Sequence, residues 1–281
     1  MKLAPLILFI IFSSSLFAGG PWLNKKKEGF LQIQSTFPTG AYSVLFLENN
    51  KELQLQRPVL DYTFQAYLEY GVSDKLDLIL TLPYKIVSTQ GVTQNVQNSN
   101  PLSSRSLNGL GNSKFGLKYQ LLNKSLKLAS SIQTSFNTVG HDLEKGLITG
   151  YAANAIGLYI HIGKGFNKNL YSFLDVGINK MSNNFSSFLE MHYELGYQLK
   201  PSFWTAFTLD LRESFKDGSY NNENLKQTAL YTNNQEYFAF GIKTSYELKN
   251  KVGFTAASFG AFSGNYVAKI ATFSLGIYKK W

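Results

Sequence analysis

Long stretches of the chain alternate between apolar and polar residues with a period of two. Leucine occupies every even position from Leu76 to Leu82, and apolar residues occupy every odd position from Phe115 to Leu121. A strand places successive side chains on opposite faces, whereas a helix repeats about every 3.6 residues. The pattern therefore predicts β-strands with one apolar and one polar face.

This periodicity predicts about twelve strands, each about ten residues long or longer. They are expected at 28–37, 59–72, 75–84, 110–121, 125–137, 152–163, 169–181, 187–199, 202–215, 235–248, 252–263 and 266–281. A tilted strand needs about ten residues to cross a bilayer, so each of these strands is long enough to span a membrane.

The connectors between the expected strands differ in length at the two ends. At one end they are short turns, such as 122–125 and 249–251. The other end carries the long polar stretches 38–58, 85–109, 138–151 and 216–234. Short periplasmic turns and longer external loops are the plan of a bacterial outer-membrane barrel. We therefore expect an all-β, transmembrane, antiparallel up-and-down β-barrel in the bacterial cell outer membrane, and assign its loops no internal structure.

A soluble β-sandwich also alternates, so strand length and aromatic placement must separate the two folds. Sandwich strands usually have about five or six residues, half the length expected here. Aromatic residues also gather near strand ends on the apolar face, as in the girdles of membrane barrels. These residues are Tyr84, Phe115, Phe136, Phe203, Phe215 and Phe273. Both observations favour the barrel.

The first 18 residues have the character of a targeting segment. A positive start at Lys2, an apolar run to Phe12 and a small residue at Ala18 are typical of a cleaved secretory signal. We expect a signal peptide at 1–18 and a single barrel domain at 19–281, in which segment 19–27 is long enough only to occlude the periplasmic mouth. The absence of cysteine excludes disulfides and thiolate metal sites.

The last expected strand ends in a terminal aromatic residue that follows alternating apolar residues. Phe273, Leu275, Ile277 and Trp281 share one parity. This pattern resembles the signal that barrel-assembly machinery recognises. We therefore expect that machinery as a partner, through the strand that ends in Trp281.

The chain carries 27 Lys and Arg against 18 Asp and Glu, a net charge of +9. The basic residues are scattered over turns and loops without a patterned patch, so nucleic acid is not an expected partner. Outer-membrane lipid is expected around the barrel, and lipopolysaccharide at its outer rim. The basic residues expected at that rim are Lys51, Arg57, Arg105 and Lys145.

Three segments resemble a known family. They are Gly20-Pro21-Trp22 with Lys25-Lys26-Lys27-Glu28-Gly29-Phe30-Leu31, the stretch 67–78 (YLEYGVSDKLDL), and the stretch 109–119 (GLGNSKFGLKY). They resemble the start, the second hairpin and the glycine-led fourth strand of outer-membrane barrels filed as the meta-pathway of phenol degradation family, or as transporter-like barrels. The resemblance covers mainly 20–121. It implies a barrel that passes small, often aromatic or apolar, compounds and that is not an enzyme.

The polar parity of the strands defines the inner wall of the expected barrel. Mixed charges are expected to face inward, where water or partners stabilise them. The candidates for lining the lumen are Glu190, His192, Glu194, Asp210, Arg212, Trp204, Phe188, Phe173, Tyr159 and Tyr237. Aromatic rings beside polar groups suit small apolar or aromatic solutes, but rings also serve simply to fill a narrow barrel.

Register arithmetic places four of these candidates opposite one another. Two consecutive strands join through a tight turn at Pro201, and facing residues of an antiparallel pair have a constant sum of residue numbers. We expect Leu199 to pair with Phe203 across that turn. This register sets His192 opposite Asp210, and Glu190 opposite Arg212, as pairs of opposite charge.

Catalytic motifs are scarce. The chain has no Walker loop, no GxSxG elbow and no HExxH helix. No catalytic site, metal or cofactor is expected, because the three histidines are far apart. His161 and His192 have lumen parity, unlike the lipid-facing site of outer-membrane phospholipases. His141-Asp142, in an external loop, resembles the acid–histidine pairing of rim proteases, but a solvated turn is the favoured interpretation.

These observations predict a passive channel or transporter for small aromatic or apolar solutes, and no enzymatic activity. Two alternatives stay open. One is an outer-membrane enzyme with a site at the extracellular rim. The other is a closed structural barrel without transport.

Overall fold

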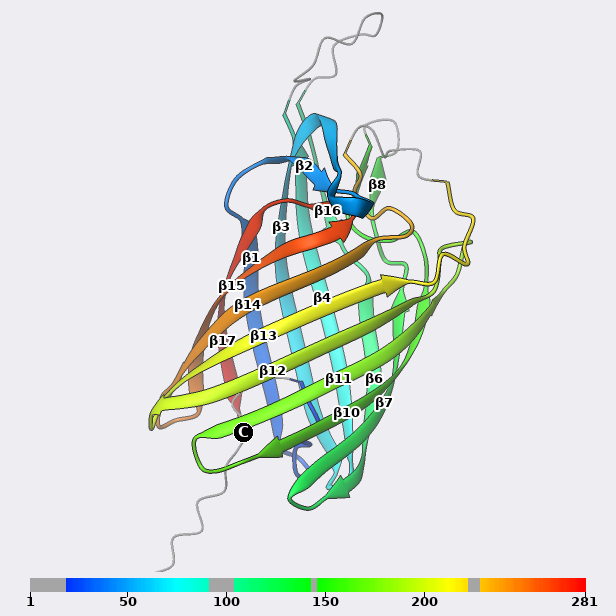
Figure 1. Cartoon of the computed structure of the whole chain (residues 1–281). Coiled ribbons are helices and arrows are strands. Elements are labelled where there is room, and N and C mark those ends of the chain that lie inside the picture. The colour runs from blue at the N-terminus through cyan, green and yellow to red at the C-terminus, as the bar shows by residue number, and fades with distance from the viewer. Residues whose placement is uncertain (1–18, 91–103, 143–145, 222–227) are drawn as a thin grey trace, which may run out of the picture.

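The computed structural model describes residues 19–90, 104–142, 146–221 and 228–281. Within these ranges, twelve long antiparallel strands form one closed barrel (Figure 1). They are β1 (Gly29–Pro38), β3 (Glu52–Ser73), β4 (Leu76–Thr89), β6 (Ser113–Asn123), β7 (Leu126–Phe136), β10 (Ala155–Gly165), β11 (Leu170–Met181), β12 (Phe188–Lys200), β13 (Phe203–Ser214), β14 (Glu236–Glu247), β15 (Val252–Asn265) and β17 (Ala271–Lys280). Each pairs with its neighbours along the chain, and β1 also pairs with β17 to close the barrel. The predicted up-and-down barrel is confirmed, whereas the expected signal peptide lies outside the described residues.

The outer face of the barrel is apolar because one parity of each strand points outward. Ile33 on β1, Leu158 on β10 and Leu275 on β17 expose 48%, 65% and 56% of their surface. Large apolar side chains at such exposure are unfavourable in water, but they are stable against lipid acyl chains. The expected girdle residues Tyr84, Phe115, Phe136, Phe215 and Phe273 are also exposed, whereas Phe203 is half-buried.

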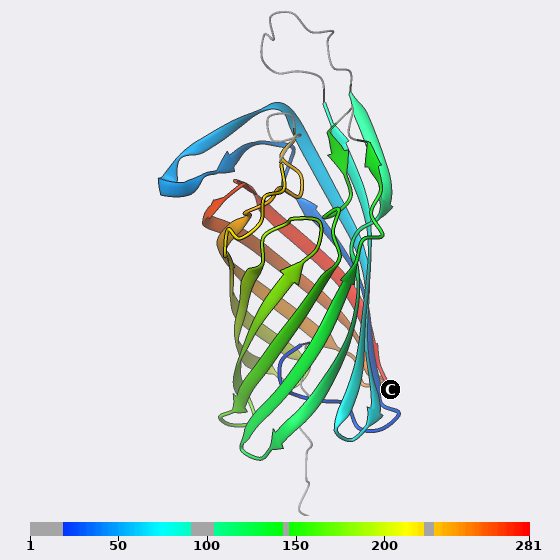
Figure 2. The same cartoon turned by 90° about the vertical axis from the view of Figure 1, so that its right-hand side faces the viewer.

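On the side of the long loops, β3 and β4 continue beyond the barrel. Their pairing runs as far as Val59 opposite Thr89, whereas the sequence pattern predicted an end near Tyr84. The short strands β2 (Tyr42–Phe46) and β5 (Arg105–Leu110) pair with these extensions. The long loops therefore contain regular structure that projects from one end of the barrel (Figure 2).

The other small elements lie at the same end. They are β8 (His141–Asp142), β9 (Leu147–Ile148), β16 (Val267–Ala268) and the 3-10 turn η1 (Glu48–Asn50). β8 pairs with β9, and β16 pairs with β2. No helix in the described ranges has the length and apolar character needed to cross a membrane.

Three strands begin at least three residues later than the sequence predicted, and one of them, expected at 152–163, begins at Ala155. The strand expected at 110–121 begins at Ser113, because Asn112 bonds to a loop instead. The Asn112 amide nitrogen donates to the carbonyl of Tyr151 over 2.8 Å, and the Tyr151 N–H donates to the Asn112 side-chain oxygen over 2.7 Å. The strand expected at 266–281 begins at Ala271, because Val267–Ala268 pairs with β2.

The outer loops pack around a hydrophobic core of their own. Its buried residues are Leu45, Leu55, Val59, Val87, Leu147, Ile148, Ala229 and Leu230. Arg57, expected at the lipopolysaccharide surface, is fully buried, so that expectation was wrong. The physical reason is that this stretch belongs to β3 and is covered by other loops. Lys51 and Arg105 are exposed, and Lys145 lies outside the described residues.

Candidate functional site

Strands β12 and β13 have the register that the sequence predicted along most of their length. Glu190 lies opposite Arg212, and His192 lies opposite Asp210. The expected pairing of Leu199 with Phe203 was wrong, because Phe203 pairs with Lys200. A bulge between Gln198 and Lys200 absorbs one residue, which preserves the register farther along the strands.

Glu194 joins the most extensively bonded group of charges on the inner wall. The side chain is fully buried, and its carboxylate accepts hydrogen bonds from the Tyr171 hydroxyl at 2.7 Å and the Lys243 ammonium at 2.6 Å. The His192 ring lies 3.7 Å from Glu194 and 2.7 Å from Asp210. Charges withdrawn from water need partners of this kind, so this group braces the wall between β11 and β14.

Glu190 and Arg212 face each other across the ladder without forming the expected ion pair. Glu190 lies 2.9 Å from the Tyr159 hydroxyl and accepts a longer bond from Asn179. The Arg212 guanidinium instead lies 3.6 Å from the centre of the Phe188 ring. A guanidinium is flat and weakly hydrated, so it stacks readily on an aromatic face. The Glu190 carboxylate and the Arg212 guanidinium therefore interact with different partners.

Tyrosine rings lie flat on the inner wall because glycine faces them across the strand pair. Tyr159 pairs with Gly177, and Tyr171 pairs with Gly196. A Cβ atom at either glycine would come within 2.2 Å of the facing ring. Because glycine has no side chain, the two tyrosine rings can lie against the wall and do not extend across the lumen.

The segment before β1 enters the barrel from the end with short turns (Figure 2). The Gly20 N–H donates to Asp175 over 3.3 Å, and the Gly20 carbonyl accepts from the buried Lys118 over 3.3 Å. The Asn24 N–H donates to the buried Asp77 carboxylate over 2.9 Å. The segment expected at the mouth is therefore anchored inside the lumen by strand side chains.

Trp22 holds this segment against an aromatic cluster. Its ring lies edge-on to Tyr171 and Phe173, with centroid distances of 5.6 and 5.7 Å. Trp204 completes the cluster at 5.5 Å from Tyr171. The predicted lumen residue Phe173 therefore contacts the N-terminal segment, and Trp204 belongs to the same buried cluster.

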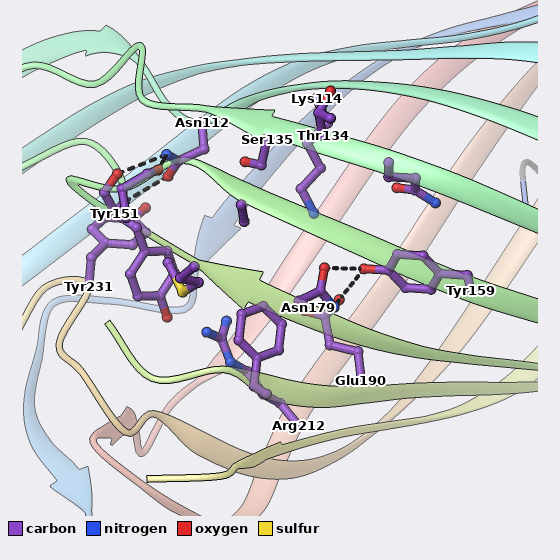
Figure 3. A pocket seen from close by; sticks show the side chains of 15 residues that line it. Asn112, Lys114, Thr134, Ser135, Tyr151, Tyr159, Asn179, Glu190, Arg212 and Tyr231 are labelled. Atoms are coloured by element: carbon purple, nitrogen blue, oxygen red, sulfur yellow. Dashed lines mark hydrogen bonds between the residues drawn. The ribbon is translucent and has the colours of Figure 1, made fainter. Parts of the chain in front are cut away.

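The upper cavity, of about 180 Å³, lies beneath the outer loops. Its lining residues come from β6, β7, β10–β13 and three connecting segments (Figure 3). They are Asn112, Lys114, Gln133, Thr134, Ser135, Tyr151, Ala153, Ala155, Tyr159, Asn179, Met181, Phe188, Glu190, Arg212 and Tyr231. Sequence reasoning missed Tyr151 and Tyr231, because they stand in loops without periodicity.

Two further cavities lie inside the barrel, and each shares lining residues with its neighbour. The middle cavity, of about 250 Å³, shares Tyr159 and Glu190 with the upper one, and Asp210 and Tyr237 also line it. The lower cavity, of about 360 Å³, shares His192 with the middle one. The wall of the lower cavity comes mainly from β1, β3, β14, β15 and β17. The lower cavity therefore lies beside the N-terminal segment, on the side of the barrel opposite β10.

A serine, a histidine and an aspartate form a hydrogen-bonded chain across three strands. The Ser131 hydroxyl lies 2.9 Å from His161 Nε2, and His161 Nδ1 lies 2.9 Å from Asp175. These distances match a hydrolytic relay. However, Ser131 is buried, and it lies in the middle of a regular strand whose backbone pairs on both sides. An oxyanion hole needs free backbone donors beside the nucleophile. We therefore assign the hydrogen-bonded Ser131, His161 and Asp175 a structural role, in which they brace the three strands.

The described residues outside the lumen offer no comparable site. His141 of the expected rim pair is exposed on the short strand β8. No group of three or more His, Asp or Glu within the described ranges is arranged to hold a metal ion.

The chain has the fold of known outer-membrane barrels. No family model and no curated protein matches it. An outer membrane channel from Pseudomonas putida F1 is similar over 95% of this chain and 100% of its own, with a TM-score of 0.73 and 13% identity. The NanC porin matches 89% of this chain and 100% of its own, with a TM-score of 0.52 and 10% identity. The KdgM porin matches 90% of this chain and 99% of its own, with a TM-score of 0.54 and 5% identity. The chain is therefore a β-barrel of the bacterial outer-membrane type.

Proposed function

We propose that this barrel is a passive outer-membrane channel for small solutes, including aromatic ones. The observation that carries the proposal is the series of three cavities, each of which shares lining residues with the next. A barrel that serves only as structure gains stability by filling its interior with close-packed side chains. Here that space follows a polar wall from the outer loops toward the periplasmic turns.

The known structures with this fold support the proposal by their names, since one is an outer membrane channel and two are porins. Aromatic compounds are included among the proposed solutes because of the resemblance of 20–121 to the phenol-degradation barrels, a resemblance that no family model matches. An enzymatic alternative at the outer rim receives no support from the exposed His141. At the same rim, the exposed Lys51 and Arg105 are the residues that we propose to meet lipopolysaccharide.

A narrowing substitution tests the route. Ala257 lines the lower cavity, and replacing it with tryptophan fills part of that space. Ser258, the next residue on β15, does not line that cavity and pairs with the outward-facing Phe273. We expect Ala257→Trp to lower the rate of liposome swelling in small neutral solutes several-fold, and Ser258→Trp to leave that rate unchanged. Equal rates in both variants and wild type would contradict this route, and no swelling in wild type would contradict the channel.

A further inference from the structure

The upper cavity contains two cations that lack a carboxylate partner within the described chain. Arg212 is only 9% exposed, and its Nε atom is buried without a hydrogen-bond partner. Lys114 points into the same cavity from β6 (Figure 3). By contrast, Lys243 in the lower cavity is paired with Glu194 at 2.6 Å. Burying a guanidinium is costly when one of its donors has no acceptor and no carboxylate balances its charge, so Arg212, which lines the cavity, is a candidate for binding an anion.

The charge of the cavity wall indicates the charge that a ligand of this cavity would carry. Glu190 is the single carboxylate among its lining residues, against the two cations Lys114 and Arg212. Glu190 already has donors in Tyr159 and Asn179. The wall therefore carries one excess positive charge, and a single negative charge on a ligand would balance it.

The shape and the rings of the cavity identify the rest of the ligand. Arg212 lies over Phe188 at 3.6 Å and near the Tyr151 ring at 5.0 Å, and Tyr231 also lines the space. A stacked guanidinium keeps its in-plane N–H groups available for a carboxylate. A cavity of about 150 Å³ is large enough to hold benzene in another protein. The volume of about 180 Å³ found here fits one aromatic ring with a small substituent.

We infer that the upper cavity is a binding site for small aromatic carboxylates. Arg212 binds the carboxylate, Lys114 adds the second positive charge, and Phe188 and Tyr151 contact the ring. This inference rests on the proposed channel function for its role, because a site beneath the outer loops selects which solutes enter the route. The binding itself is measurable without transport.

Titration calorimetry on the folded, purified chain in detergent tests the site, with benzoate as the probe. Benzamide has nearly the same shape without the charge, and acetate has the charge without the ring. We expect benzoate to bind about tenfold to a hundredfold more tightly than benzamide, the ratio that a charge-assisted contact supplies. Benzoate should also bind more tightly than acetate. Equal binding of benzoate and benzamide would overturn the inference.

Substitutions test whether Arg212 and Lys114 are the residues that bind benzoate. Arg212→Gln should reduce benzoate affinity to that of benzamide, and Lys114→Gln should reduce it by a smaller factor. Lys127→Gln is the matched control, because Lys127 bonds to Asn123 at the end of β7 and does not line the cavity. Heat-modifiable migration on gels confirms that each variant is folded. Unchanged benzoate affinity in both folded Arg212→Gln and Lys114→Gln would place the binding elsewhere and overturn the assignment.

Liposome swelling separates this inference from the channel itself. If neutral solutes permeate and benzoate binds no better than benzamide, the channel stands and the carboxylate site fails. If benzoate binds selectively through Arg212 but no solute permeates, the site stands and the channel proposal fails.

Discussion

Glu194 illustrates how single residues hold the inner wall together. It is fully buried on β12 and bonds to Tyr171 on β11 and Lys243 on β14. Its charge has therefore left water completely and is stabilised by partners from two other strands. Glu52, at the outer end of β3, forms a comparable ion pair with Lys269, but half of each side chain is exposed.

We predict that Glu194→Gln lowers the free energy of unfolding by about 3 kcal/mol, because it removes a fully buried carboxylate that bonds to both Tyr171 and Lys243. Glu52→Gln should change it by less than about 1 kcal/mol, since exposed pairs contribute little. Denaturant unfolding in lipid vesicles, followed by tryptophan fluorescence, provides the measurement. Equal destabilisation by both changes would show that burial does not set the strength of the Glu194 pair.

At the scale of elements, the N-terminal segment and β17 depend on different contacts. The N-terminal segment is held by side chains of the wall, through Trp22 on the aromatic cluster and Asn24 on Asp77. β17 is held by its backbone ladder with β1 and β15. We expect the N-terminal segment to be released more easily than any barrel strand, because it lacks the continuous backbone ladder that holds each strand.

Replacing Trp22 with alanine removes the ring that seats the N-terminal segment on Tyr171 and Phe173. We expect a higher single-channel conductance, because the freed segment no longer narrows the lumen, together with normal heat-modifiable migration. Lys26→Ala is the control, since the Lys26 side chain is exposed and only its backbone bonds to Asp74. A conductance equal to that of wild type would mean that the segment lies outside the conducting route.

The end of β17 closes the barrel at the end with short turns. The Trp281 N–H donates to the carbonyl of Gly29 over 3.2 Å, and the Trp281 ring covers Gly29 so closely that no Cβ atom would fit there. We propose that this terminal strand is also the part read by the assembly machinery. Trp281→Asp should lower the folded yield in cells, whereas Lys249→Asp, which places the same charge in an exposed turn of that rim, should not. Equal folded yields, measured by heat-modifiable migration, would argue against the signal.

At the scale of the whole molecule, the two ends of the barrel differ. Short turns close one end, and β2, β5, β8, β9 and β16 build the other around a core of its own (Figure 2). Both the N-terminal segment and Trp281 lie at the end with short turns. The large loops have a core because they are long enough to bury apolar residues against each other.

The orientation in the membrane follows from this difference. A tag inserted at 90–104, most of which lies outside the described residues, should be accessible to protease added to intact cells. A tag at 122–125, in the turn between β6 and β7, should not be accessible. Surface proteolysis with the opposite pattern would reverse the orientation and place the upper cavity on the periplasmic side.

The sequence by itself determined the strands, their two faces and much of their register. These properties are local: the period of two assigns each side chain to lipid or lumen, and this parity limits the possible offsets of neighbouring strands. His192 lies opposite Asp210 as expected, although the residues beside the turn pair differently and a bulge restores the register. Only the tertiary structure decided which lumen groups bond to one another. Arg212 stacks on Phe188 and does not pair with the facing carboxylate of Glu190. Lys118 forms an ion pair with Glu69 on β3, and Trp22 packs against Tyr171. Such contacts join side chains that meet only after the barrel has closed, and the periodicity of a single strand carries no information about them.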